Sequence, residues 1–377
     1  MSLTILITNL LLDDRSGTTL YVQDLALELK RKGHVPIVYT RRLGDVSREL
    51  ANAGISVTRD LGGIRKPPDV IHGHHWHVTN LALKRFPGVP AIYICHDHTA
   101  FVDGAAFHPQ IGRYFGVSQL CIDRLVREGV PPSRISLLRN FVDTKRFAAR
   151  DRLPTSPGRA LVFSNYAQAG THLPAVAAAC RQAGLTLDVI GKAAGNVVGD
   201  PESHLGRYDL VFAKAKAAME AMATGAAVVL CDFSGVGPMV TSENYEVLKS
   251  WNFGRQALTA PLNSESLARQ IQRYDPIDAG RVCARLRADA GLDDAVDRLC
   301  QVYREAIADF PIQATMAPGI RSLRRSRSRS VAYLAWFRLP SGIRNLLLSI
   351  PRLGATMTRA LKWTNHGDEA QPLIKPD

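Results

Sequence analysis

Three charged side chains in YDLVFAKAKAAMEAMATGAAVVLCD, residues 208–232, have types and positions suited to ligand chemistry. Lys214 and Lys216 follow a predicted buried strand at 210–212, and Glu220 lies in a short predicted helix of Ala and Met that ends at Thr224-Gly225. The carboxyl ends of parallel strands face a ligand crevice in doubly wound folds, so the two lysines are candidate anion ligands there. A carboxylate among such small residues is a candidate polar contact for a ligand.

A second set of candidate groups is histidine-rich. HGHHWH places His72, His74, His75 and His77 within six residues, and His96 follows another buried strand in ICHDH. In an extended strand, His72 and His74 point to one face and the other two point to the opposite face. One ion cannot gather all four imidazoles without a sharp bend, so no metal site is predicted.

The elements that must position these groups alternate between apolar strands and amphipathic helices. LTILITNLL, VPIVYT, PDVIHGHH, PAIYICHDH and RYFGVSQ read as strands, and SGTTLYVQDLALELKRKGH reads as a helix that Gly33 ends. After the Pro- and Ser-rich AARDRLPTSPGR the pattern repeats with ALVFSN, TLDVIGK, YDLVFA and AAVVLCD. Continuous apolar strands separated by helices predict parallel sheets covered on both faces.

The chain of 377 residues is long enough for two domains. We predict two Rossmann-like α/β domains facing a central cleft, divided as 1–150, a linker at 151–158, 159–290, a final helix at 291–312, and a basic extension at 313–377. Six cysteines without a C-x-x-C pair, several in apolar strands, predict buried thiols and a cytoplasmic location. The N-terminus reads as a core strand rather than a signal peptide, and no stretch is apolar enough to span a membrane.

The net charge of +13 is concentrated near the C-terminus. From Gly319 onward there are 11 basic and 3 acidic residues, so this end carries +8 of the total. RSLRRSRSRS lacks the interleaved aromatics of a nucleic-acid site, so nucleic acid is not an expected partner. Aromatic, aliphatic and basic residues over 321–363 suit an anionic membrane surface at the inner face of the membrane. The alternative is that these segments pack on the body or stay disordered.

The order of several motifs resembles the family 4 glycosyltransferases. Five motifs follow one another as in that family, over roughly residues 3–310: SGTTLYVQDLALELKRKGH, DVIHGHH, ICHDH, GVSQLCIDRLVREGVPPSRISLLRNFVDTKRF and AAMEAMATGAAVV. The resemblance implies the GT-B fold and a nucleotide-diphosphate sugar bound by the C-terminal domain. It further implies a glycan or lipid-linked acceptor on the N-terminal side, and transfer with retention, without metal or other cofactor.

The resemblance also assigns donor-binding residues. Glu220 matches the second acid of the family's E-x7-E motif, which hydrogen-bonds the ribose, and we expect it at a helix start. Thr224 and Gly225 belong to the same block and join the donor-binding set. The first acid is replaced by Phe212, and its glycine-rich loop by AKAKAAM. Lys214 and Lys216, with Lys192 after the preceding strand, are the candidate cations for the diphosphate.

On the N-terminal side, Gly17 lies between a strand and a helix, where backbone amides can approach an anionic oxygen. The resemblance makes Gly17, with Ser16 and Thr18, a diphosphate or acceptor loop. It makes His96 the catalytic-side histidine that approaches the donor sugar. The D-V-x-H-x-H pattern makes His72 and His74 candidate acceptor contacts. The predicted site thus consists of the donor-binding residues, His96 and these acceptor-side residues.

Two further functions stay open at this point. Phe212 and the missing phosphate-binding cations after the first strand of the second domain also fit a non-catalytic GT-B protein that binds a nucleotide or glycan without transfer. A GT-B epimerase acting on a nucleotide sugar is a third reading, although its expected acids are not identifiable. Free nucleoside diphosphate released with a glycosylated product would distinguish transfer from binding.

Overall fold

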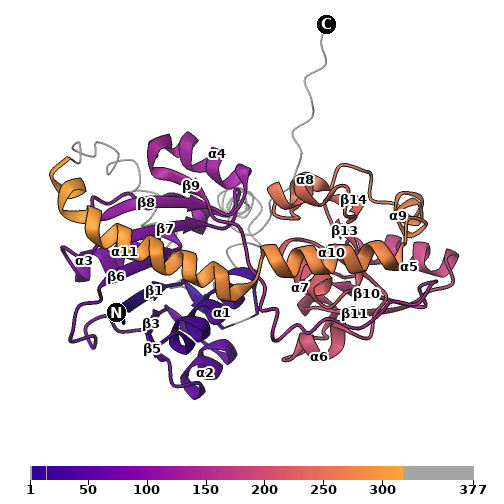
Figure 1. The fold of residues 1–377 in the computed structure, drawn as a ribbon, viewed down its shortest axis with the longest axis horizontal. Coiled ribbons are helices and arrows are strands. Elements are labelled where there is room, and N and C mark those ends of the chain that lie inside the picture. Colours follow the sequence, from indigo (N-terminus) through magenta and orange to yellow (C-terminus); the bar gives the residue numbers. More distant parts are fainter. Residues whose placement is uncertain (1, 14, 317–377) are drawn as a thin grey trace, which may run out of the picture.

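The computed structural model describes residues 2–13 and 15–316 and shows two α/β domains side by side (Figure 1). The predicted fold class is confirmed: each domain is built on a largely parallel sheet with helices against it. Residues 317–377, which include most of the predicted basic extension, lie outside the described residues.

The first domain contains a seven-stranded parallel sheet in the order β5-β3-β1-β6-β7-β8-β9. Its central strands are continuous apolar runs because both of their faces are buried. In chain order the strands are β1 Thr4–Thr8, β3 Val35–Tyr39, β5 Ser56–Thr58, β6 Val70–His74, β7 Ala91–Cys95, β8 Ile111–Gly116 and β9 Ile135–Leu137, with a small separate pair of β2 Leu11–Leu12 and β4 Arg42–Leu43. The helices are α1 Gly17–Arg31, α2 Asp45–Asn52, α3 Trp76–Arg85 and α4 Gln119–Glu128.

The second domain contains a five-stranded sheet in the order β11-β10-β12-β13-β14. Only its last pair is antiparallel, so the ends of β10, β11, β12 and β13 share one edge. The strands are β10 Arg159–Phe163, β11 Thr186–Ile190, β12 Leu210–Ala213, β13 Ala227–Asp232 and β14 Gly235–Met239. The helices are α5 Leu173–Gln182, α6 Pro201–Leu205, α7 Ala215–Ala223, α8 Tyr245–Ser250, α9 Ser264–Ile271 and α10 Pro276–Asp289.

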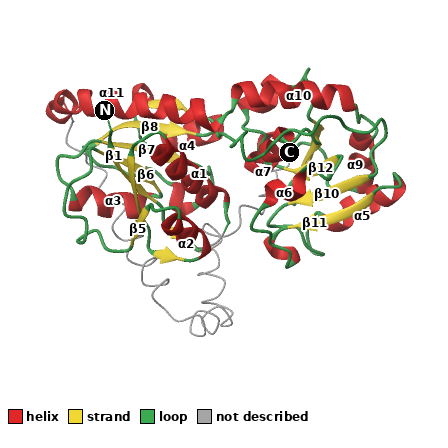
Figure 2. Ribbon diagram, turned by 60° about the horizontal axis from the view of Figure 1, so that its bottom comes forward, coloured by secondary structure: helices red, strands yellow, loops and turns green. Residues whose placement is uncertain are grey.

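The last described helix, α11 Leu292–Met316, returns to the first domain. It packs against α1 and β8, and its Val296, Leu299 and Tyr303 are fully buried in the first core. Figure 2 shows α10 and α11 in succession along one side of the molecule, α10 over the second domain and α11 over the first. The final helix predicted at 291–312 is therefore present, and it completes the N-terminal core.

The chain crosses between the domains at two points that touch each other. Phe141 packs in the first core and Val142 in the second, and the return crossing runs through Gly291. The Val142 amide donates to Ala290 (2.9 Å), and the Leu292 amide donates to the Val142 carbonyl (2.9 Å). The crossing thus comes before the predicted boundary at 150, because the apolar residues just after Phe141 already belong to the second core.

Several local predictions match the structure. Helix α1 ends at Arg31 and is followed by Gly33 with φ of +82°, and α7 ends before Thr224 and Gly225, where φ is +86°. All six cysteines are buried and unpaired, as predicted. Phe212 lies within β12, as the strand predicted at 210–212 requires, between Val162 and Val229 of the neighbouring strands, and none of its surface is exposed.

The position of Phe212 gives the first testable prediction. Restoring the family's acid by Phe212→Glu should not create a sugar ligand, because the carboxylate would be buried in a hydrophobic core without a partner. We expect Phe212→Glu to lower the free energy of unfolding by on the order of 4 kcal/mol. The apolar control Phe212→Leu should cost about 1.5 kcal/mol. Urea unfolding measures both, and a Glu variant as stable as the Leu variant would show that this position is open to solvent.

Candidate functional site

The carboxyl edge of the second sheet gathers polar and aromatic side chains from three strand ends. Lys214 follows β12 and forms an ion pair with Asp232, the last residue of β13. The Lys214 ammonium lies 5.8 Å from the ring centre of Tyr166 and 5.5 Å from that of Phe233, and the two rings are 5.4 Å apart at 71°. This edge cluster places one cation in an aromatic setting where cation–π attraction holds it.

Asp232 fixes the position of the Lys214 ammonium. Its side chain is fully buried, and its Oδ1 accepts from the amide (2.6 Å) and hydroxyl (2.5 Å) of Ser234. Burial alone would raise the pKa of Asp232, but Lys214 and the Ser234 hydrogen bonds hold this pKa below its usual value. The carboxylate is therefore charged and rigidly oriented.

Lys192 and Asn165 lie at the ends of β11 and β10 on the same edge. Lys192 is exposed at the start of a short 3-10 turn, Lys192–Ala194, and its amide donates to Asn165 Oδ1 (3.2 Å). Asn165 Nδ2 donates in turn to the Arg15 carbonyl of the first domain (3.2 Å). The predicted cation at Lys192 is thus on the expected edge, and Asn165 connects this edge to the other domain.

The start of α1 lies next to this connection. Ser16 is the residue before the helix and its hydroxyl contacts that of Thr19 (2.9 Å). Gly17 is exposed, and a side chain there would meet no atom within 4 Å, whereas Thr18 is half-buried. Ser16–Thr18, predicted as a loop, are therefore the cap and first turn of α1, and they present an open helix N-terminus next to the Arg15–Asn165 contact, an arrangement that attracts anions.

Lys216 and Glu220 belong to a separate group at the domain interface. Lys216 Nζ lies 2.7 Å from Asp24 Oδ2 of α1 and 3.5 Å from Glu220 Oε1, and Arg146 Nη2 lies 2.8 Å from Asp24 Oδ1. This interface cluster is almost completely buried, with Glu220 only 2% exposed. Glu220 lies in the middle of α7, so its predicted place at a helix start is wrong, because the helix already begins at Ala215.

Burial controls the protonation of this interface cluster. Burial raises the pKa of Glu220, and the neighbouring Lys216 partly offsets that effect. Burial would lower the pKa of Lys216, but Asp24 and Glu220 hold it above its usual value. Lys216 therefore stays charged and bridges two carboxylates from different domains, whose second counter-charge is Arg146.

A left-handed residue separates the two lysines. Ala215 has φ of +49°, a region that costs a non-glycine residue about 1 kcal/mol. Its amide donates to the Phe253 carbonyl (2.8 Å), and Phe253 and Asn252 are themselves left-handed. This turn sends Lys214 toward Asp232 and Lys216 toward Asp24, so the predicted pair of diphosphate cations is divided between two sites.

The histidines of the first domain form a buried cluster around Tyr21. His72 Nδ1 is 2.5 Å from the Tyr303 hydroxyl, and His74 Nδ1 is 2.8 Å from His96 Nε2. The Tyr21 ring lies 5.4 Å from His74 and 4.7 Å from His96. His72 and His74 are fully buried, which contradicts the prediction that they contact an acceptor, whereas His96 is half-buried at the cluster's rim.

The histidine run does not continue as a strand. Strand β6 ends at His74, His75 has φ of +59°, and α3 begins at Trp76, so His77 lies on a helix. Within residues 2–13 and 15–316, no three His, Cys, Asp or Glu side chains are placed to hold a metal ion. The opposite-face arrangement predicted for His75 and His77 is therefore replaced by a strand-to-helix turn.

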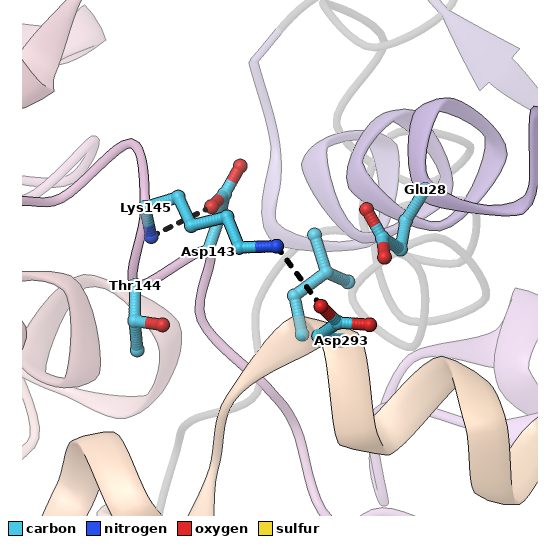
Figure 3. A pocket seen from close by; sticks show the side chains of 6 residues that line it. Glu28, Asp143, Thr144, Lys145 and Asp293 are labelled. Carbon is cyan, nitrogen blue, oxygen red and sulfur yellow. Dashed lines mark hydrogen bonds and ion pairs between the residues drawn. The ribbon is translucent and has the colours of Figure 1, made fainter. Parts of the chain in front are cut away.

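A small hollow lies at the domain crossing, away from the edge cluster. Figure 3 shows Lys145 reaching Asp293 at the start of α11, with Glu28 of α1 opposite. Lys145 Nζ is 2.9 Å from Asp293 Oδ2, and Lys32 also pairs with Asp293. At about 20 Å³ the hollow has room for one water molecule and none for a nucleotide.

The structure brings some predicted residues together and leaves others apart. Lys192 and Lys214 lie on the same sheet edge, which Asn165 connects to Arg15 just before the Ser16–Thr18 segment. Thr224 and Gly225 lie at the far end of α7, where the Thr224 hydroxyl donates to Ala221 (2.8 Å). Sequence reasoning missed Asp232, although a carboxylate that ends a buried strand is a readable signal. It also missed Asp24, whose partner lies 192 residues away.

Comparisons with known proteins agree with this architecture. The Glycosyltransferase Family 4 model matches residues 15–146. A glycosyltransferase from Rickettsia africae ESF-5 has 13% identity and a TM-score of 0.58 over 81% of this chain and 99% of its own. Anabaena Alr3699/HepE in complex with UDP has 14% identity and a TM-score of 0.59, over 81% of this chain and 100% of its own.

Sucrose-phosphate synthase from Thermosynechococcus elongatus has 14% identity and a TM-score of 0.55, over 81% of this chain and 99% of its own. No curated protein sequence matches the chain significantly. The chain thus has the GT-B fold of glycosyltransferases, and its first domain carries the family 4 pattern. The predicted resemblance is confirmed at this level.

The histidine cluster predicts a pH dependence of stability. Burial lowers the pKa of His72 and of His96 to about 3, so both stay neutral in the folded protein at pH values where an unfolded histidine is charged. Their contribution to the free energy of unfolding is complete above pH 6.5 and is lost as the pH falls from 6.5 toward 3. The expected slope is about 1.4 kcal/mol per pH unit for each histidine.

Urea unfolding between pH 7 and pH 5 measures this slope. His72→Asn should remove one histidine's share of the slope, whereas the exposed control Ile277→Ala should leave the slope unchanged. The buried carboxyl of Asp103 has a pKa of about 7, so its protonation stabilises the folded state as the pH falls, opposite to the effect of the histidines. This effect is the same in all three proteins and cancels when their slopes are compared. Equal slopes for His72→Asn and the native chain would contradict a neutral buried His72.

Proposed function

We propose that this protein is a glycosyltransferase that moves a sugar from a nucleotide-diphosphate donor to a glycan or lipid-linked acceptor, with retention at the anomeric carbon. The observation that carries the proposal is the placement of Lys214, held by Asp232, at a sheet edge beside the open N-terminus of α1. Cell-surface polysaccharide or glycolipid synthesis is the process that such an acceptor implies.

The charge of the donor explains this arrangement. When the bond from the anomeric carbon to the diphosphate breaks, negative charge collects on the departing diphosphate oxygens. Lys214 and the exposed Lys192 supply cations from the second domain, and the amides at Gly17 supply a helix N-terminus from the first. Together they stabilise the leaving group without a metal ion.

Glu220 keeps a role in this proposal as the ribose ligand. An ionised carboxylate can accept hydrogen bonds from two vicinal hydroxyls. In the described arrangement Lys216 covers Glu220 and bridges it to Asp24. In this proposal donor binding requires the 3.5 Å contact between Lys216 and Glu220 to open, so that the carboxylate can accept from the ribose hydroxyls.

His96 is the proposed contact of the first domain with the sugar. Its imidazole is neutral because burial lowers its pKa to about 3, and His74 orients the ring through its Nε2. A neutral imidazole can hydrogen-bond a sugar hydroxyl but adds no charge near the reacting carbon. The Anabaena protein that shares this fold is described in complex with UDP and glucose, which supports a nucleotide sugar as the donor class.

A non-catalytic GT-B protein that binds a nucleotide or glycan is the second candidate. Phe212 is buried in the core, and Glu220 and Lys216 neutralise each other at the interface, so two family positions are occupied by structural contacts. Consumption of a nucleotide sugar in the presence of native membrane lipids favours transfer. Tight binding without consumption of any donor favours the second candidate.

The proposed role of Lys214 is tested by thermal unfolding with UDP, GDP, ADP and CDP. A ligand at about a hundred times its dissociation constant adds roughly 2.7 kcal/mol to stability. We expect the nucleoside diphosphate of one base to raise the unfolding midpoint of the native chain. Lys214→Gln should weaken the binding of that nucleotide about tenfold, which lowers the stability gained on binding by roughly 1.4 kcal/mol.

Lys145→Gln is the matched control, because Lys145 is an exposed lysine at the domain crossing. The Lys145→Gln variant should bind the nucleoside diphosphate as tightly as the native chain does. Loss of binding in Lys145→Gln and not in Lys214→Gln would move the diphosphate site to the crossing and would sink the assignment of the edge cluster.

We also propose a peripheral position at the inner face of the membrane. No helix in the part of the chain that the structure describes is both long and apolar enough to cross a bilayer. The basic and aromatic residues of 321–363 lie beyond that part, and their composition alone supports contact with anionic lipid.

Vesicle sedimentation tests the membrane proposal. The full chain should bind vesicles containing anionic lipid and not neutral ones, with about 1 kcal/mol for each cation near the surface. Replacing the five arginines of 321–329 by serine should release the protein, and so should high salt. Equal binding to neutral and anionic vesicles would contradict an electrostatic contact.

A further inference from the structure

Three neutral imidazoles lead from the core of the first domain to the carboxyl edge of its sheet. His72 and His74 belong to β6, and His96 directly follows β7. Burial lowers the pKa of His72 and of His96 to about 3, and it lowers the pKa of His74 well below the usual value. Each ring therefore carries a single proton at neutral pH, on one of its two nitrogens.

The hydrogen bond between two of these rings has two possible directions. His74 Nδ1 lies 2.8 Å from His96 Nε2, and only one of these nitrogens can donate. If His74 donates, the proton of His96 lies on Nδ1; if His96 donates, its Nδ1 is bare. The groups around His74 decide between these two tautomers.

Three buried polar atoms near these rings have no partner in the described part of the chain. They are Tyr21 Oη, His72 Nε2 and His74 Nε2, and each of these residues is at most 2% exposed. The ring centres are 4.5 Å apart for the two histidines, and Tyr21 lies 5.4 Å from His74 and 6.5 Å from His72. Buried polar atoms of native proteins are nearly always paired, with water included, so we expect these three to complement one another.

The Tyr21 hydroxyl brings a donor to this group of atoms. Burial raises the pKa of Tyr21, so the hydroxyl keeps its proton. A water molecule that accepts from Tyr21 has two hydrogens to donate, and bare Nε2 atoms on His72 and His74 accept both. Protons on the two Nε2 atoms would instead bring three donors together without an acceptor from the described residues, and an unmet buried donor is costly.

Bare Nε2 atoms place the proton of each ring on Nδ1. His72 then donates from Nδ1 to the Tyr303 hydroxyl (2.5 Å), and His74 donates from Nδ1 to His96 Nε2. Since His96 Nε2 accepts, the single proton of that ring lies on Nδ1. His96 Nδ1 contacts no polar atom of the described residues and is not fully buried, so a ligand can reach it.

We propose that His74 is a positioning residue that fixes the proton of His96 on Nδ1, so that His96 presents a hydrogen-bond donor at the carboxyl edge of the first sheet. The ligand atom that suits this donor is an oxygen with a free lone pair, as in a sugar hydroxyl. Only the choice of a sugar rests on the proposed function, because the tautomer is a property of the ligand-free chain.

Proton–nitrogen correlation NMR tests the tautomer directly. The full chain is labelled with the heavy nitrogen isotope in its histidines, and the spectrum shows which ring nitrogen carries the proton. At pH 7 we expect the Nδ1–H tautomer at both His74 and His96, with the His96 signals identified by their loss in His96→Gln. The Nε2–H tautomer at His96 in the native chain would overturn the proposal, whether or not any variant of His74 folds.

Two substitutions of His74 separate positioning from packing. His74→Asn keeps an amide N–H near the position of Nδ1 and should leave His96 in the Nδ1–H tautomer. His74→Leu fills the space without a donor, so His96 should become a mixture of both tautomers. Ile277→Ala, at an exposed position on α10, should give the native His96 spectrum. A folded His74→Leu variant with the native tautomer at His96 would show that His74 does not set it.

Titration with UDP-glucose and GDP-mannose separates this inference from the proposed function. An oxygen that accepts from His96 should shift the Nδ1–H signal in the native chain and in His74→Asn. If neither nucleotide sugar binds and His96 still carries its proton on Nδ1, the transferase proposal loses its support and positioning by His74 stands. If a nucleotide sugar binds and His96 is the Nε2–H tautomer, positioning by His74 fails alone.

Discussion

The double crossing at Val142 and Gly291 is the constraint on which the rest of the structure depends. Two backbone hydrogen bonds tie the outgoing chain to the returning chain, so the domains join at one narrow place. Every other interdomain contact described above is made by side chains, with Asp24 and Lys216 as its buried centre. This connection sets the carboxyl edge of the second sheet opposite the N-terminus of α1.

Two neighbouring lysines have different electrostatic roles. Lys216 offsets Asp24 and Glu220 inside the interface, where unpaired carboxylates would cost several kcal/mol. Lys214, only two residues earlier, is partly exposed at the carboxyl edge of the second sheet, where it pairs with the buried Asp232. The strained Ala215 between them makes this division possible, and strained backbone of this kind is frequent at functional sites.

The fold could be predicted because its signals are local. Apolar runs, helix-ending glycines and the repeated strand–helix order gave two Rossmann-like domains and the ends of α1 and α7. The site was less predictable because its pairs are distant in sequence: Lys216 meets Asp24 across the interface, and His72 meets Tyr303 from the last helix. Burial of His72 also depends on that helix, which no local pattern near residue 72 reveals.

The return of α11 has a consequence for the order in which the protein acquires its structure during synthesis. The first domain is translated first, but Val296, Leu299 and Tyr303 of its core leave the ribosome only after the whole second domain. Until then, His72 also lacks its tyrosine partner. Although domains generally fold in the order of translation, here the first one made is the last one finished.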